Sequence, residues 1–175
     1  MSTLRGDVML LTHGGGGPVV GAAVLLDGVL EGSLDVLGGR RIVAGRELPG
    51  SPLLADVRRR VVGGPPASPH EWIVRAAAFA PHRVACELIA AGVASPLAQR
   101  FGREFTLSVD ARAEAAARSR IAEDPALAGL LYVAGLPTGD PLPPATYTLP
   151  EAARAILQTL RSASVGDNLA ARIAG

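Results

Sequence analysis

The sequence predicts a mainly α-helical fold, a compact single-domain helical bundle over residues 1–175 with one or two short β-hairpins, the second protruding. Three observations predict it. The chain has 175 residues, of which 49% are hydrophobic, enough for one well-filled core and too few for two comfortable domains. Capping residues or prolines precede most of the apolar segments. Most of those segments have helical spacing, and only two stretches are typical of paired strands.

Local signals predict where the helices begin and end. Helices are expected at 4–11, from Pro18 to about Gly32, and from Pro52 to about Gly63. Further helices are expected from Pro69, from Pro81 to Gly92, from Asp110 to about Glu123, from Pro125, from Thr148, and over 165–174. Capping boxes are predicted at Ser68 with Glu71 and at Thr148 with Glu151, because a serine or threonine three residues before a glutamate can satisfy two helix-terminal amides.

Two hairpins and two loops complete the predicted order. Gly38 and Gly39 predict the turn of a first hairpin. A second hairpin is expected at about 94–109, with polar residues at its tip. The glycine block 14–17 is expected as a loop, and the proline-rich stretch 137–150 as an irregular surface loop.

Composition excludes several classes of function. The formal net charge is +1, and all 17 positive side chains are arginines, so no concentrated basic face for nucleic acid is expected. The one cysteine and three scattered histidines lack the spacing of a metal site, and no cofactor is expected. No apolar run is long enough to span a bilayer, and no secretory signal is present. The expected location is cytoplasmic, with a peripheral position at the inner membrane face as an alternative.

No catalytic arrangement is predicted. The glycine block lacks both nucleotide-binding fingerprints, and a flexible linker is the better interpretation. His82 and Cys86 are four residues apart on one expected helix, a spacing that allows contact. Cys86 lies among Val84, Ala85 and Leu88, which favours a small core residue over a nucleophile. Arginines 58–60 are consecutive and are expected on a solvated face.

The tip of the second hairpin is a candidate contact surface. Arg100 and Arg103 flank Phe101, and Leu97 lies nearby. Arginines on headgroups and apolar side chains in the interface would suit an anionic membrane surface. The same mixture could pack against another subunit or form an ordinary solvated turn.

The order of the apolar motifs resembles that of the Golgi phosphoprotein 3 family. The motif sequences are carried by 4–11, Ala22–Leu34, Gly50–Asp56, Trp72–Arg75, Arg83–Val93 and Leu127–Leu136. Within the second of these, Asp27 matches the acidic position of the family helix and Gly32 its glycine. The chain is similar to a short bacterial member of that family.

The resemblance implies a compact helical fold with a protruding hairpin, no enzymatic activity, and peripheral binding to the headgroup of phosphatidylinositol 4-phosphate. Eukaryotic members are adaptors for Golgi glycosyltransferases. The family's headgroup pocket uses a loop tryptophan and several arginines. Here the glycine block replaces the tryptophan, Gly21 stands at the second-helix arginine, and the later arginines fall near Ala78 and Pro81. Arg83, with His82 beside it, is the candidate that remains, so the headgroup site is expected to be degenerate.

Three functions follow from these features. The first is a non-catalytic peripheral adaptor that binds an anionic, phosphoinositide-like lipid. The second is a soluble interaction or regulatory module that binds a protein partner or forms a homo-oligomer. The third is a small-molecule-binding enzyme, in which the 137–150 loop with Asp140 and Tyr147 would cover a pocket.

Overall fold

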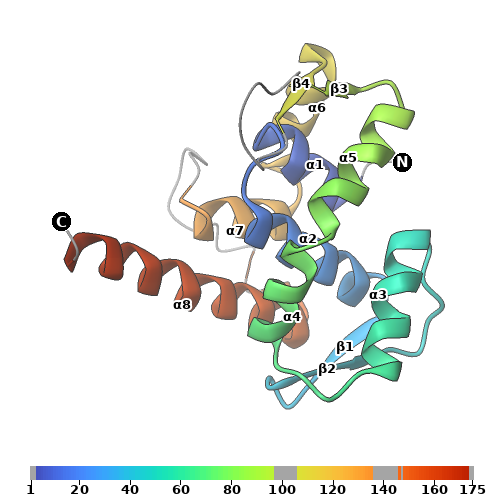
Figure 1. The fold of residues 1–175 in the computed structure, drawn as a ribbon, viewed down its shortest axis with the longest axis vertical. Coiled ribbons are helices and arrows are strands. Elements are labelled where there is room, and N and C mark those ends of the chain that lie inside the picture. The colour runs from blue at the N-terminus through green and yellow to red at the C-terminus, as the bar shows by residue number, and fades with distance from the viewer. Residues whose placement is uncertain (1–2, 97–105, 136–145, 147, 174–175) are drawn as a thin grey trace.

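The computed structural model describes residues 3–96, 106–135, 146 and 148–173, and the side chains of the last helix as far as residue 163. The chain is mainly helical, as the sequence predicts, with two small antiparallel sheets (Figure 1). The described elements are α1 (Leu4–Leu11), α2 (Gly17–Leu30), β1 (Leu34–Leu37), β2 (Arg41–Ala44), α3 (Pro52–Gly63), α4 (Pro69–Ala77), α5 (Ala80–Ala90), β3 (Ala94–Pro96), β4 (Leu107–Val109), α6 (Ala111–Arg120), α7 (Pro125–Val133) and α8 (Glu151–Ile173).

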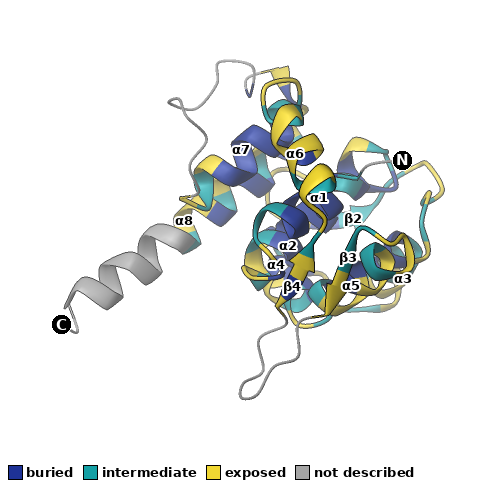
Figure 2. Cartoon of the chain, turned by 90° about the horizontal axis from the view of Figure 1, so that it is seen from above, coloured by how far each residue is buried: buried dark blue, intermediate teal, exposed yellow. Residues whose placement is uncertain are grey.

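Helix α2 forms the centre of the core. Its residues Val20 to Leu26 are all buried, and α1, α4, α5, α7 and α8 pack around it. A single cluster of buried apolar side chains joins α2 to these helices, to α3 and to the first hairpin. Figure 2 shows the buried residues gathered on α1, α2 and α7, with α6 largely exposed.

Side-chain caps fix the starts of several helices. Ser51 Oγ accepts from the Leu54 amide at 3.2 Å. The predicted capping box at α4 is confirmed, because Glu71 N donates to Ser68 Oγ at 3.3 Å and Ser68 N donates to Glu71 Oε2 at 2.7 Å. Asp110 caps α6, as expected, and Asp124 caps α7 one residue before Pro125.

The two hairpins lie at opposite ends of the molecule (Figure 1). In the first, Leu34 pairs with Ala44 and Val36 with Ile42, and both Gly38 and Gly39 have positive φ, which confirms the predicted glycine turn. In the second, Ala94 pairs with Val109. The tip of the second hairpin and most of the proline-rich loop lie outside the described residues.

The prediction of two helices at the C-terminal end is wrong. A single helix, α8, runs from Glu151 to Ile173 and contains Gly166. The predicted break lay before residue 165, near Ser162 and Ser164, and an ordinary residue such as serine costs at most about 0.7 kcal/mol relative to alanine inside a helix, which is too little to end it. The helix also begins at Glu151, three residues after the predicted cap Thr148.

Candidate functional site

Two segments far apart in the sequence meet beside the first turn of α2. They are the glycine loop after α1, which leads directly into α2, and the connection from α4 to α5. A Cβ at Gly17 would lie 3.6 Å from the Ala77 carbonyl oxygen, so the loop passes along the end of α4. Gly14 and Gly16 have φ of 90° and 77°, which allows the loop to turn directly into α2. These are the segments in which the family resemblance places the headgroup pocket.

Gly21 is a packing residue at this junction. It is buried, and a Cβ there would lie 2.8 Å from the Ile73 carbonyl oxygen and 2.9 Å from the Ala77 nitrogen. These distances are too short for any side chain, so α2 and α4 approach each other closely because residue 21 is glycine. An arginine here would require the two helices to separate.

His82 and Arg83 lie on the first turn of α5, and both are exposed. Their helix begins without a side-chain cap, and so does α2 at Gly16. The described starts of α1, α3, α4, α6 and α7 all have such a cap. The positive ends of α2 and α5 therefore lack a side-chain acceptor, which favours an approaching anion.

The expected contact between His82 and Cys86 is present, with 3.8 Å between Nε2 and Sγ. The prediction that Cys86 is a core residue is wrong, because its side chain is exposed. At about 100° per residue, Val84 and Ala85 point into the core, whereas Cys86 lies roughly 100° beyond Ala85. Its apolar neighbours in sequence are therefore not its neighbours in space.

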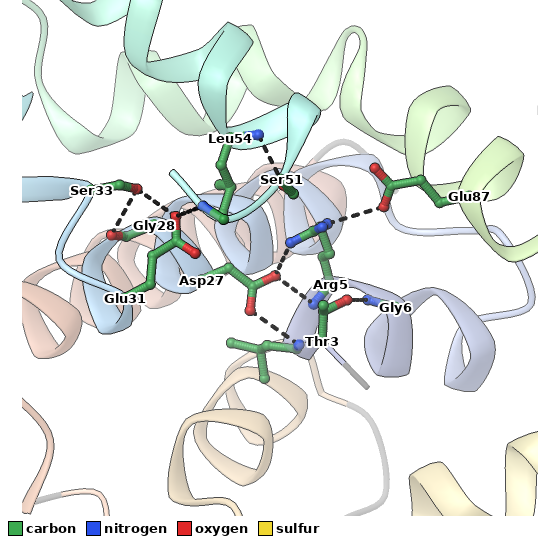
Figure 3. Close-up of polar contacts among 12 residues, drawn as sticks. Thr3, Arg5, Gly6, Asp27, Gly28, Glu31, Ser33, Ser51, Leu54 and Glu87 are labelled. Carbon is green, nitrogen blue, oxygen red and sulfur yellow. Dashed lines mark hydrogen bonds and ion pairs between the residues drawn. The ribbon is translucent and has the colours of Figure 1, made fainter. Parts of the chain in front are cut away.

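A buried polar cluster lies at the other end of α2 (Figure 3). The Arg5 side chain is 5% exposed and its Nη1 lies 2.9 Å from Asp27 Oδ2, while its Nε lies 3.4 Å from Glu87 Oε2. Asp27 also accepts from the backbone amides of Leu4 and Arg5 at 3.1 and 3.3 Å. Burial raises the pKa of Asp27, and the Arg5 guanidinium partly opposes that rise.

This cluster anchors α1. The first amides of a helix have no intrahelical acceptor, and here Asp27 supplies one from α2 while Thr3 Oγ1 accepts from Gly6 N at 3.2 Å. Farther along α1, buried Asp7 pairs with Arg120 of α6, whose Nε lies 2.8 Å from Asp7 Oδ2. The acidic position identified by the family resemblance thus has a structural role. Sequence reasoning missed the cluster, although a lone aspartate within an apolar helix is a signal for one.

The arginine run at 58–60, on α3, has local partners. Arg59 and Arg60 both lie 3.2 Å from Asp56 oxygens, and the Arg60 guanidinium lies 4.5 Å from the centre of the Phe79 ring. Arg58 Nη2 donates to the Gly45 carbonyl at 3.4 Å. The three side chains spread around α3, as their consecutive positions predict.

The base of the second hairpin is tied to the glycine loop. Leu107 N donates to the His13 carbonyl at 3.1 Å, and His13 Nε2 lies 3.6 Å from Glu114 Oε2 of α6. The predicted contact residues Leu97, Arg100, Phe101 and Arg103 lie outside the described residues. Within the described part of the chain, no group of three His, Cys, Asp or Glu side chains could hold a metal ion.

None of the helices within the described ranges is both long and apolar enough to cross a membrane. None of the curated proteins matches the chain with significant similarity. Residues 5–138, most of the chain, match the sequence profile of the family described as Golgi phosphoprotein 3 (GPP34), and the chain therefore belongs to the Golgi phosphoprotein 3 family.

Proposed function

We propose that this chain is a non-catalytic peripheral membrane protein of the Golgi phosphoprotein 3 type, an adaptor that binds anionic lipid through the surface around the starts of α2 and α5. The observation that carries the proposal is the meeting of two helix starts without side-chain caps beside exposed Arg83 and His82. Two positive helix ends and a guanidinium suit a phosphate group.

The same surface argues for weak headgroup selectivity. A specific phosphoinositide pocket needs several charged donors, and each such hydrogen bond contributes about 1.5–3 kcal/mol. The close approach of α2 and α4 at Gly21 leaves no room for a donor side chain at that position. Binding should therefore depend more on the charge of the membrane than on the identity of its headgroup.

Vesicle flotation at low and high salt tests the proposal. We expect the protein to float with vesicles that contain phosphatidylserine, to stay behind with neutral vesicles, and to be released by salt, since salt screens exposed charges. Vesicles with phosphatidylinositol 4-phosphate at matched charge should bind no more than several-fold better. Arg83→Ala should weaken binding, and Arg40→Ala, an exposed arginine on the first hairpin, is the matched control.

Two outcomes would count against this function. A protein that stays wholly unbound at low salt would exclude the membrane role. Tight, headgroup-selective binding that Arg83→Ala abolishes would show that the pocket is intact and not degenerate.

A soluble interaction module is the second candidate, and exposed apolar side chains favour it. Leu48 is 81% exposed, Leu37 is 63% exposed, and Val62 and Val74 are also exposed. Apolar side chains of this kind can serve contact with a protein partner or a second copy. Light scattering over a range of concentrations tests it, because a monomer at every concentration would argue against self-association.

A further inference from the structure

A cavity of about 180 Å³ lies between the C-terminal end of α7 and the first half of α8. Tyr132 and Val133 of α7 form one wall, and Arg154, Leu157, Gln158 and Arg161 of α8 form the other. All of α8 lies beyond residue 138, where the family match ends. The cationic wall of this cavity is therefore not part of the matched family segment.

Arg154 and Arg161 of α8 both face the cavity because of their spacing along the helix. Ala153, Ile156 and Leu160 are buried and fix the face of α8 that meets the core. Arg154 and Arg161 are seven residues apart, so they differ by only about 20° around the helix axis and by about 10 Å along it. They stand on the same flank of α8, and both line the cavity.

Neither arginine is paired within the described part of the chain. They are exposed, and neither forms an ion pair or a side-chain hydrogen bond with any of the residues that the structure describes. Glu151 is three residues before Arg154 and does not pair with it. By contrast, Arg5, Arg59, Arg60, Arg118 and Arg120 all have carboxylate partners. This wall of the cavity is therefore positive, with no compensating carboxylate paired to it among the described residues.

Leu157, Tyr132 and Val133 give the cavity an apolar part, beside the polar side chains of Gln158 and Thr146. Leu157 is 7% exposed and Tyr132 is 36% exposed. A Cβ at Gly129 would lie 3.0 Å from Leu157 Cδ1 and 3.3 Å from Thr146 Cγ2, so glycine lets these two side chains pack closely against α7. A packed apolar side chain, an aromatic side chain and two cations in one cavity suit an amphipathic ligand.

We propose that this cavity binds a small aromatic carboxylate. A guanidinium can hold a carboxylate through two parallel hydrogen bonds, and an aromatic ring can stack against Tyr132 and cover Leu157. The size is suitable, because an engineered apolar cavity of about 150 Å³ in another protein accepts benzene. The inference does not depend on membrane binding, since it uses different residues on a different pair of helices.

Isothermal titration calorimetry on the full chain with three probes tests the proposal. The probes are 2-naphthoate, its neutral analogue 2-naphthamide, and inorganic phosphate. We expect 2-naphthoate to bind at submillimolar concentration, and the other two probes to bind at least about tenfold more weakly because each lacks either the charge or the ring.

Variants locate the site. Arg154→Gln and Arg161→Gln should each weaken 2-naphthoate binding by about tenfold, the effect of losing one charge-assisted contact. Arg112→Gln, at an exposed arginine of α6, is the matched control and should change nothing. Amide chemical shifts that move in α7 and α8 on titration, with the rest of the spectrum unchanged, would show a folded protein and a local site.

Four results would overturn the proposal. The first three are no binding of 2-naphthoate at millimolar concentration, equal binding of 2-naphthoate and 2-naphthamide, and unchanged affinity in both α8 variants. Inorganic phosphate that binds as tightly as 2-naphthoate would also overturn it, because the site would then recognise charge alone.

Discussion

Helices α2 and α8 occupy opposite extremes of packing in this molecule. The middle of α2 is enclosed: its residues Val20 to Leu26 are buried, its aspartate is paired, and one of its glycines lies against the backbone of α4. The described half of α8 is buried on one face only, and its two arginines border an open cavity without partners. Arginine thus stabilises the fold near α2, where Arg5 is paired, whereas the arginines of α8 are available for recognition.

The largest effect on stability is expected when the paired carboxylate of α2, Asp27, is removed. Asp27→Ala would leave Arg5 buried with only Glu87 nearby and would remove the acceptor for two amides of α1. Breaking a buried ion pair in this way costs about 3–5 kcal/mol. Urea unfolding followed by circular dichroism measures it. The control is Glu123→Ala after α6, an exposed carboxylate that forms no side-chain hydrogen bond with the described residues, where a change within about 0.5 kcal/mol is expected.

A smaller effect on stability is expected from a substitution at Gly21, where α2 packs against the backbone of α4. Alanine is normally a better helix former than glycine by about 1 kcal/mol. At position 21, however, the added carbon would collide with the backbone of α4, and overpacking typically costs 1–3 kcal/mol. Gly21→Ala should therefore lower the free energy of unfolding.

Gly63→Ala is the matched control for that substitution, because a Cβ at the end of α3 meets nothing within 4 Å. It should leave stability unchanged or raise it slightly. If both substitutions stabilised the protein equally, the close approach of α2 and α4 would be disproved.

The capping box of α4 offers a pH-dependent test of a surface interaction. Hydrogen bonds from the Ser68 amide and hydroxyl lower the pKa of Glu71. A lowered folded-state pKa gives stability that is present above the unfolded pKa of about 4.3 and is lost as the pH falls through the folded value. The stability difference between the wild type and Glu71→Gln should therefore be largest near neutral pH and shrink in acid. A difference that is constant across this range would show that the carboxylate charge contributes nothing.

The sequence predicted most of the fold because its strongest signals are local. Ser51, Ser68 and Asp110 each bind amides within three residues, so a short window contains the whole interaction. The exposure of Cys86 was missed because burial depends on angular position around α5, and apolar neighbours in sequence do not report it. The continuity of α8 was missed because the stretch with Ser162 and Ser164 has no strong helix signal, although serine weakens a helix too little to end it.

The candidate site was harder to predict for a physical reason. Gly17 and Ala77 are neighbours only because α2 and α4 pack together, and Arg5 meets Glu87 across the fold. No local pattern encodes such contacts. The predicted headgroup surface at Arg83 and His82 stays a prediction. The arginines of α8 could be recognised as lacking described partners only from their surroundings in the structure.

The smallest effect on stability is expected at the two cavity arginines of α8, and it tests the contrast between α2 and α8 most directly. Because Arg154 and Arg161 have no partners among the described residues, Arg154→Gln and Arg161→Gln should each change the free energy of unfolding by less than about 0.5 kcal/mol. The same substitution at Arg5, which removes both of its ion pairs, should cost about 3–5 kcal/mol. If the α8 variants instead lost more than about 1 kcal/mol, the arginines would be stabilising the seam between α7 and α8, for example through the negative end of α7. Charges that leave stability unchanged while they alter binding of an anion are the expected signature of a recognition surface.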